Sequence, residues 1–268
     1  MKAITLFVTC LIDLFKPEAA VAAVRILERR GCTVNFPQGQ TCCGQFSYNA
    51  GYPEQAARLA RHWLETFEPN PHPLVALSGS CAAMVVDTYP NLLYEDTLSR
   101  GGTSADAQQW KTRAETMARR ICELSQWVCD HDSGINQRSE ADVRVAYHLG
   151  CHMRRILKAG TEVQDMMVRR GVSLIEPENA DQCCGFGGTY SMTEPAISAA
   201  LADSKWEQVH KTGCIALTGA DMGCLLHLEG RASRLHDPSR VLYLAELLDM
   251  AETGQLELLS EGKHRHGR

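Results

Sequence analysis

The sequence predicts an α/β fold of two Rossmann-like domains, each a small parallel sheet flanked by helices and related to the other by an internal duplication. Two adjacent cysteines followed by a glycine occur twice, at residues 42–44 and 183–185. Another cysteine precedes each pair by 32 residues, at Cys10 and Cys151. Short apolar runs alternate with stretches of helical periodicity in the same order in both halves. A repeat of this length indicates duplication and a pseudo-twofold relation between the halves.

The first half begins with an apolar run at residues 3–9 that is typical of a buried parallel strand, and this strand delivers Cys10 at its carboxyl end. A helix is expected from Pro17 to Arg30, because proline suits a first helical turn and Gly31 ends the pattern. The further expected elements are a strand at 33–36, a helix at 53–67, a strand at 74–77 and a short helix at 82–88. This order implies right-handed crossovers and a parallel sheet.

The second half repeats that order after a helical stretch at about 94–130 and a polar linker at 130–142. We therefore expect one domain at 1–135 and another at 142–268. The expected elements are strands at 143–149, 172–175 and 215–217 and helices at 161–170, 194–211 and 239–250. The basic tail at 263–266 is expected to be disordered, with weak metal binding as the alternative.

Composition limits the class of protein. The 268 residues carry a net charge of −5 and are 44% hydrophobic, which gives no electrostatic case for nucleic acid or an anionic membrane. No run approaches the roughly 20 apolar residues of a membrane span. The apolar start is short and interrupted by Asp13, so a buried strand explains it better than a signal peptide. We expect a cytoplasmic protein whose twelve cysteines are reduced.

Eight of the cysteines form two matching sets of candidate metal ligands. Vicinal thiols close only a strained disulfide, whereas a turn presents both sulfurs to one metal centre. The loops that carry them follow strands, and the carboxyl ends of parallel strands are where ligands gather. Four thiolates hold either zinc or an iron–sulfur cluster, and three separate loops with a vicinal pair favour the polynuclear centre. The predicted ligands are Cys10, Cys42, Cys43 and Cys81 in the first set and Cys151, Cys183, Cys184 and Cys224 in the second.

The other candidates carry weaker signals. Four cysteines have no counterpart in the other half and are expected to be buried structural thiols: Cys32, Cys122, Cys129 and Cys214. His148 and His152 flank Cys151. Each is expected to be a structural histidine or one that supports a ligand, with a histidine ligand or proton carrier as the alternative, and His227 is expected to be packed. Arg154 and Arg155 are candidates for pairing with a carboxylate substrate, with ordinary helix-surface arginines as the alternative. The glycines at 185–188 lack the spacing of a phosphate loop.

At these residues the chain resembles the cysteine-rich (CCG) domain family, in which two copies occur in iron–sulfur subunits of heterodisulfide reductase, glycolate oxidase and anaerobic glycerol-3-phosphate dehydrogenase. The segments 78–84 and 150–152 are most similar to the lactate utilization protein A family, and the resemblance covers almost the whole chain. It implies an iron–sulfur subunit of a complex that oxidises L-lactate to pyruvate, with [4Fe-4S]-type clusters, up to one per domain. The implied partners are a ferredoxin-type iron–sulfur subunit and a further subunit.

Two departures leave alternatives open. Ser78 and Asp221 stand where heterodisulfide reductase has the first cysteine of a Cys-x-x-Cys, so each set offers four thiolates. The chain also lacks the ferredoxin cysteine run, so any relay belongs to a partner. One alternative is a subunit of another 2-hydroxy-acid oxidoreductase, such as one acting on glycolate, or of a disulfide reductase. The other is a structural zinc-binding assembly module. No catalytic residue is assigned.

Overall fold

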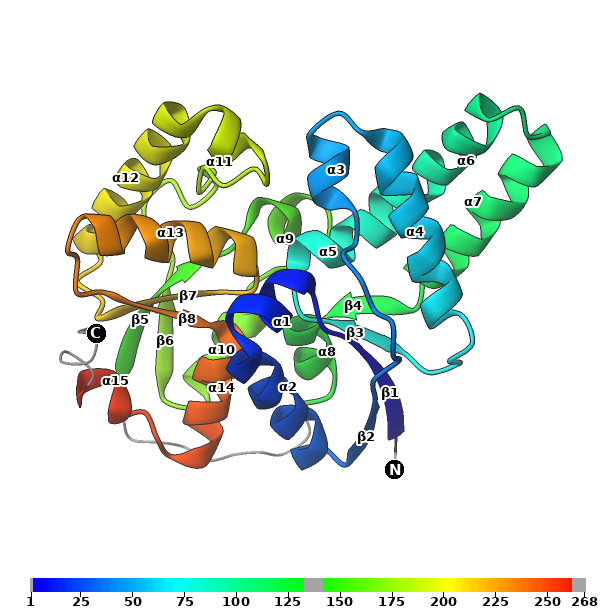
Figure 1. Ribbon diagram of the computed structural model, residues 1–268. Helices are drawn as coiled ribbons and strands as arrows, with labels where there is room; N and C mark the ends of the chain where they lie inside the picture. Colours follow the sequence, from blue (N-terminus) through cyan, green and yellow to red (C-terminus); the bar gives the residue numbers. More distant parts are fainter. Residues whose placement is uncertain (1, 133–141, 262–268) are drawn as a thin grey trace.

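The computed structural model describes residues 2–132 and 142–261 and shows two four-stranded sheets flanked by helices (Figure 1). All strand pairs are parallel, and the strand orders are β2-β1-β3-β4 and β6-β5-β7-β8. The predicted α/β fold class is therefore confirmed. The strands are β1 Lys2–Phe7, β2 Cys32–Asn35, β3 Leu74–Ala76, β4 Ile121–Glu123, β5 Val143–His148, β6 Val172–Ile175, β7 Ala216–Gly219 and β8 Arg240–Tyr243. Most of the predicted linker and the basic tail lie outside the described residues.

The first strand of each half occupies the same place in its sheet. In β1, Ile4, Leu6 and Phe7 are all buried, as expected for a strand covered on both faces. The chain leaves β1 to form β2 on one side and then β3 on the other, and β5 has the same relation to β6 and β7. This reversal of direction is a topological switch point, where loops at the carboxyl ends of the strands open a crevice.

Helices follow nearly every strand. In the first half they are α1 Cys10–Phe15, α2 Pro17–Arg29, α3 Gln45–Asn49, α4 Pro53–Phe67, α5 Gly79–Ala83, the π-helical turn η1 Met84–Thr88, α6 Tyr89–Ser99, α7 Ser104–Ala118 and α8 Leu124–Asp130. In the second they are α9 Cys151–Arg155, α10 Glu162–Val168, α11 Tyr190–Thr193, α12 Pro195–Lys211, α13 Met222–Arg234, α14 Leu244–Thr253 and α15 Leu258–Glu261. Among the described residues, no helix combines the length and apolar character needed to cross a membrane.

The fourth strand of each sheet was not expected from the sequence. The sequence pattern predicts helices over residues 121–123 and 240–243. This prediction is wrong, because both segments are β-strands. Each strand is only three or four residues long and passes directly into α8 or α14. A short apolar run beside a helix has no distinguishing periodicity. The change is marked instead by N-cap residues in extended conformation, Glu123 and Tyr243.

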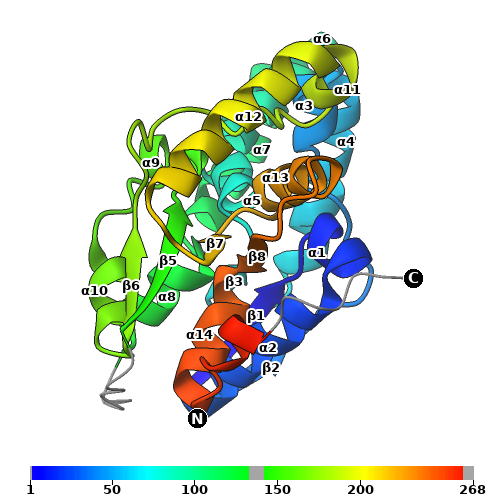
Figure 2. The same ribbon diagram turned by 90° about the vertical axis from the view of Figure 1, so that its left-hand side faces the viewer.

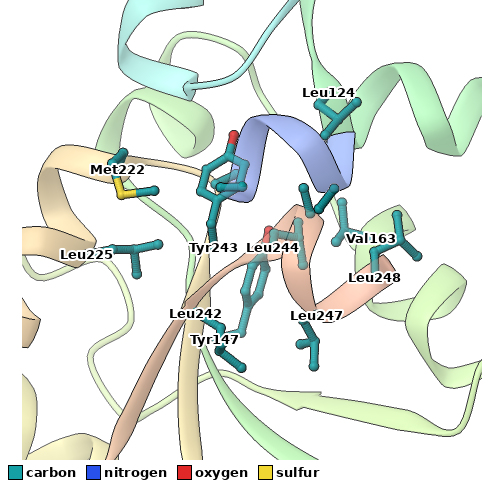
Figure 3. Close-up of a cluster of buried hydrophobic side chains, with 14 of the residues drawn as sticks. Leu124, Tyr147, Val163, Met222, Leu225, Leu242, Tyr243, Leu244, Leu247 and Leu248 are labelled. Carbon is teal, nitrogen blue, oxygen red and sulfur yellow. The ribbon is translucent and has the colours of Figure 1, made fainter. Parts of the chain in front are cut away.

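The two halves share a hydrophobic core. Leu124 of α8 belongs to the same buried cluster as Val163 of α10 and Leu244 and Leu248 of α14 (Figure 3). Helix α14 also packs along α2 of the first half, as the two views show (Figures 1 and 2). Because buried apolar contacts cross from one half to the other, the carboxyl ends of the two sheets are held in a fixed relation.

Candidate metal centre

Both cysteine sets open on one pocket between the two sheets' carboxyl ends. All of the eight predicted cysteines except Cys42 line this pocket. The space between its atoms amounts to about 650 Å³, including its opening to solvent, which is within the size of ordinary ligand sites. All twelve cysteines lie in the described part of the chain and are free thiols. The structure therefore brings together the residues that the sequence repeat singled out.

The first set is a contiguous group of four sulfurs. Cys10 begins α1 after β1, Cys42 and Cys43 lie in the loop before α3, and Cys81 is in α5 after β3. The Cys43 thiol donates to the Cys81 sulfur over 3.3 Å, which is too long for a disulfide. Hydrogen bonds from the Cys10 and Cys43 thiols lower the pKa of Cys42 to about 3, while the pKa values of Cys10 and Cys43 are raised. Four sulfurs gathered in this way are a soft donor set for zinc or iron.

The glycine of each Cys-Cys-Gly turn is required by the backbone. Gly44 has φ +86° and Gly185 has φ +91°, in the left-handed region that favours glycine. The Gly44 and Gly185 N–H groups point at the first sulfur of each pair, with N–S distances of 3.4 Å to Cys42 and Cys183. This turn leaves the first cysteine of each pair accessible and buries the second.

The second set is arranged similarly but has different surroundings. Cys184 and Cys224 are buried and in contact, Cys183 is exposed, and Cys151 is half-buried. The Cys184 hydrogen bond favours the Cys224 thiolate, yet burial and the Asp221 carboxylate outweigh it and raise the pKa of Cys224 to about 11. No thiol of this set has a lowered pKa comparable to that of Cys42 among the groups with a resolved shift.

His148 lies deeper in the second site than the sequence indicated. A ring nitrogen of His148 and the sulfurs of Cys184 and Cys224 lie within 4.8 Å of one another, and all three residues are buried. Neither ring nitrogen has a hydrogen-bond partner. Burial, followed by the nearby Lys205 ammonium, lowers the pKa of His148 to about 4, so the imidazole is neutral at neutral pH. The available sequence signal was its place at the end of the strand, three residues before Cys151.

The two positions that lack a cysteine join the halves beside the pocket. One carboxylate oxygen of Asp221 accepts the Ser80 N–H at 2.8 Å and the Ser78 hydroxyl at 3.2 Å. Next to them, the Gly79 N–H donates to the Ala220 carbonyl at 2.9 Å. Asp221 is buried, so these charge-assisted bonds lie out of solvent. Residues 78 and 221 thus connect the two cysteine sites.

His152, unlike His148, lines the pocket itself, and it faces the first half. Its Nδ1 lies 3.5 Å from the Cys151 sulfur, and its Nε2 accepts from the Gln45 amide at 3.2 Å. The hydrogen bond with Cys151 raises the pKa of His152. Above it, Phe46 and Phe186 meet edge to face with ring centroids 5.9 Å apart. The glycine-rich segment after Cys184 therefore forms part of the pocket wall.

Other candidates are occupied elsewhere. Arg154 pairs with Glu176 at 2.7 Å and does not line the pocket, and Arg155 is exposed. His227 lies 3.2 Å from the Ser198 hydroxyl, as a packed histidine would. The four unmatched cysteines lie in or against the hydrophobic core, away from the pocket: Cys32, Cys122, Cys129 and Cys214.

The fold and the site define a class of protein: a duplicated α/β chain with two thiol-rich sites that indicate metal binding. The model of the cysteine-rich CCG domain matches twice, at residues 4–86 and 145–229. "Lactate utilization protein A" of Geobacillus kaustophilus is 39% identical over 251 residues, covering 92% of this chain and 98% of that protein. The protein of the same name from Bacillus cytotoxicus is 38% identical over 252 residues, with coverage of 92% and 98%.

The chain therefore belongs to the lactate utilization protein A family, whose members it matches along nearly their whole length. A crystal structure of a hypothetical protein from Helicobacter pylori has the same fold, with a TM-score of 0.65 and 14% identity. The match covers 94% of this chain and 49% of that one, and at this identity it shows a similar fold and nothing about function.

Proposed function

We propose that this protein is the iron–sulfur electron-transfer subunit of a cytoplasmic complex that oxidises L-lactate to pyruvate. The observation that carries the proposal is the convergence of two cysteine sets on one pocket. The relatives named for lactate utilization supply the substrate. Contiguous sulfurs such as those of Cys43 and Cys81, 3.3 Å apart, fit the donor set of an iron–sulfur cluster.

The chain's own residues would bind and shield such a centre. The eight cysteines would hold up to one [4Fe-4S]-type cluster per half, and a bound cluster supplies one-electron redox chemistry. The second cysteine of each pair, Cys43 or Cys184, is buried and keeps water from the inner side. Cys183 is exposed, so the outer side of the second site is the accessible one for electron exchange.

Electron transfer through this chain requires partners. The sequence has no ferredoxin cysteine run, so we expect a ferredoxin-type iron–sulfur subunit and a further subunit to complete the relay. Helices α3 and α11 both lie toward the top of the molecule in Figures 1 and 2, next to segments that line the pocket, and they carry exposed Tyr48, Tyr190 and Met192. An apolar rim of this kind suits contact with another protein.

The test is a metal and sulfide analysis on protein purified without oxygen, combined with electron paramagnetic resonance. Iron and acid-labile sulfide in comparable amounts, with a signal that appears or disappears on reduction, would support the proposal. Zinc that persists after reconstitution with iron and sulfide would contradict it. Mixing the loaded chain with its partners and L-lactate, with glycolate as the control, then tests the substrate: faster reduction of the centre by glycolate would favour the other 2-hydroxy acid.

A structural zinc module is the second candidate, and one observation favours it. His148, Cys184 and Cys224 form a buried group that offers three of the four ligands of a Cys₃His structural zinc site. This candidate predicts a colourless protein without a reducible centre. The first cysteine set, with four sulfurs, suits a Cys₄ zinc site and an iron–sulfur cluster alike, so it does not distinguish the two candidates.

A further inference from the structure

The two cysteine sites differ in what lies behind them. The strand position of His148 in β5 is that of Phe7 in β1, since each residue ends its strand three residues before the first cysteine of its set. Phe7 is fully buried and meets Trp63 edge to face, with ring centroids 5.6 Å apart. The first site therefore has an aromatic wall that offers no ligand.

The second site has polar side chains at the matching positions. The glycine of each Cys-Cys-Gly turn faces the same helix position, Leu59 of α4 in the first half and Leu201 of α12 in the second. Four residues further on, this alignment pairs Trp63 with Lys205. The aromatic pair of the first half is thus replaced by His148 and Lys205, which are 4% and 1% exposed.

A buried imidazole without partners is costly unless something binds it. Both nitrogens of His148 are unpaired, and leaving a buried polar group unsatisfied costs about 1–3 kcal/mol per group. Lys205 does not relieve this, because its ammonium is directed to the carbonyls of Asn179 and Ala180. The sulfurs of Cys184 and Cys224 lie within 4.8 Å of a ring nitrogen and are candidate partners for it.

We propose that His148 is a nitrogen ligand of the metal centre in the second half, which makes that centre a mixed thiolate–imidazole site and leaves the first an all-thiolate one. For comparison, zinc–sulfur bonds of about 2.3 Å and zinc–nitrogen bonds of about 2.0 Å place ligand atoms that share one tetrahedral ion within about 4 Å of one another. The 4.8 Å spread of the three atoms needs only a small contraction to reach that geometry. The inference rests on the proposed metal-binding function and adds a residue that the cysteine motif does not contain.

The experiment is pulsed electron paramagnetic resonance on the full-length chain, reconstituted with iron and sulfide and labelled with ¹⁵N only in histidine. A directly bound imidazole gives the wild-type spectrum a strong ¹⁵N coupling. The variant His148→Phe, which installs the residue of the first half, loses that coupling. The matched control His152→Gln, at the histidine that lines the pocket, keeps it. Replacement by sulfur in His148→Cys removes the coupling and shifts the midpoint potential of the second centre downward, because a thiolate is the more negative ligand.

The outcomes separate this inference from the function it rests on. An iron-loaded wild type without the coupling, or one whose coupling survives in both His148 variants, overturns the inference and leaves the iron–sulfur function standing. Should the chain hold zinc and no iron, X-ray absorption at the zinc edge asks the same question. Nitrogen among the zinc ligands that disappears in His148→Cys would support His148 as a ligand, although the iron–sulfur proposal would then fail. Zinc bound by sulfur alone would overturn the His148 inference.

Discussion

Adjacent cysteines in this protein occupy different environments. Cys42 is half-buried and has the lowered pKa, whereas Cys43 is buried, and its carbonyl accepts the Tyr89 hydroxyl at 2.8 Å. The Tyr89 hydrogen bond to the Cys43 carbonyl fixes the turn, and the Cys43 sulfur is a proposed metal ligand. The cysteine positions are therefore the most informative single residues to change.

Replacing Cys43 by serine should remove most of the metal bound by the first half, or roughly half of the total with one cluster in each half. Cys184→Ser should do the same in the second half. Iron per chain, measured after anaerobic reconstitution, checks both. The matched control is Cys122→Ser, a thiol packed against the core and absent from the pocket. Equal iron in all three variants would remove the cysteines from the ligand set.

Glu123 should make the stability of the chain depend on pH. It is 1% exposed, and burial raises its pKa from 4.5 to about 7 even though it accepts from Ser125 and Tyr243. A raised pKa means that the folded chain binds this proton more tightly than the unfolded chain does. Protonation of Glu123 therefore stabilises the fold fully below pH 4.5, and this stabilisation is lost as the pH rises through 7. The loss is on the order of 3 kcal/mol.

The measurement is urea unfolding at pH 5 and pH 8 for the wild type and for Glu123→Gln. Between pH 5 and pH 8 the wild type should lose about 3 kcal/mol of unfolding free energy that the variant keeps, because glutamine does not titrate. The same difference at both pH values would show that Glu123 is not protonated in the folded chain.

At the scale of elements, the Cys-Cys-Gly turn depends on the helix beneath it. A β-carbon on Gly185 would lie 2.5 Å from the Ser198 carbonyl of α12, in addition to the strain of a positive φ. We expect Gly185→Ala to destabilise the protein by about 2–4 kcal/mol and to lower metal binding in the second half. Thermal unfolding and iron per chain check this.

The control for that substitution is Gly213→Ala. Gly213 also has a positive φ, of +67°, but a β-carbon there would meet nothing within 4 Å. Gly213→Ala should lower the free energy of unfolding by about 1 kcal/mol, the penalty of a positive φ for alanine, and should leave metal binding unchanged. A Gly185 variant no less stable than this control would show that the turn tolerates movement of α12.

At the scale of the whole molecule, a buried ion network ties the halves together on the side away from the pocket. Arg30 and Arg170 come from the duplicated Arg-Arg-Gly segments, and both reach Glu252, at 2.6 and 3.1 Å. The Glu252 side chain is 0% exposed. Burial favours its neutral form, but Arg30 and Arg170 outweigh that effect and lower the pKa of Glu252. The repeated arginines thus converge on one carboxylate.

Removing the Glu252 carboxylate should destabilise the folded protein. Glu252→Ala leaves buried guanidinium groups unpaired, and we expect a loss of about 3–5 kcal/mol in the free energy of unfolding. Chemical denaturation measures it. Glu68→Ala, which removes the part-exposed Arg113 pair, should cost no more than about 1 kcal/mol. Similar small losses of unfolding free energy in both variants would mean that the buried ion network does not stabilise the contact between the halves.

The sequence by itself determined the duplication, the α/β class and most of the strands and helices. Helix α4 was predicted at its observed bounds, Pro53–Phe67, because its periodicity and its proline are local signals. The cysteine sets were found from spacing alone, and their role as ligands stays a prediction. The family followed from the same spacing and is confirmed by the relatives.

Tertiary structure alone decided which residues meet. The strands β4 and β8 are too short to carry a periodic signal, so their place in a sheet depends on neighbours far away in the chain. Three contacts join residues far apart in the sequence: the hydrogen bond from the Ser80 N–H to Asp221, the convergence of Arg30 and Arg170 on Glu252, and the position of His148 near Cys184. Local pattern encodes which elements form, whereas packing between them sets which side chains share a buried site.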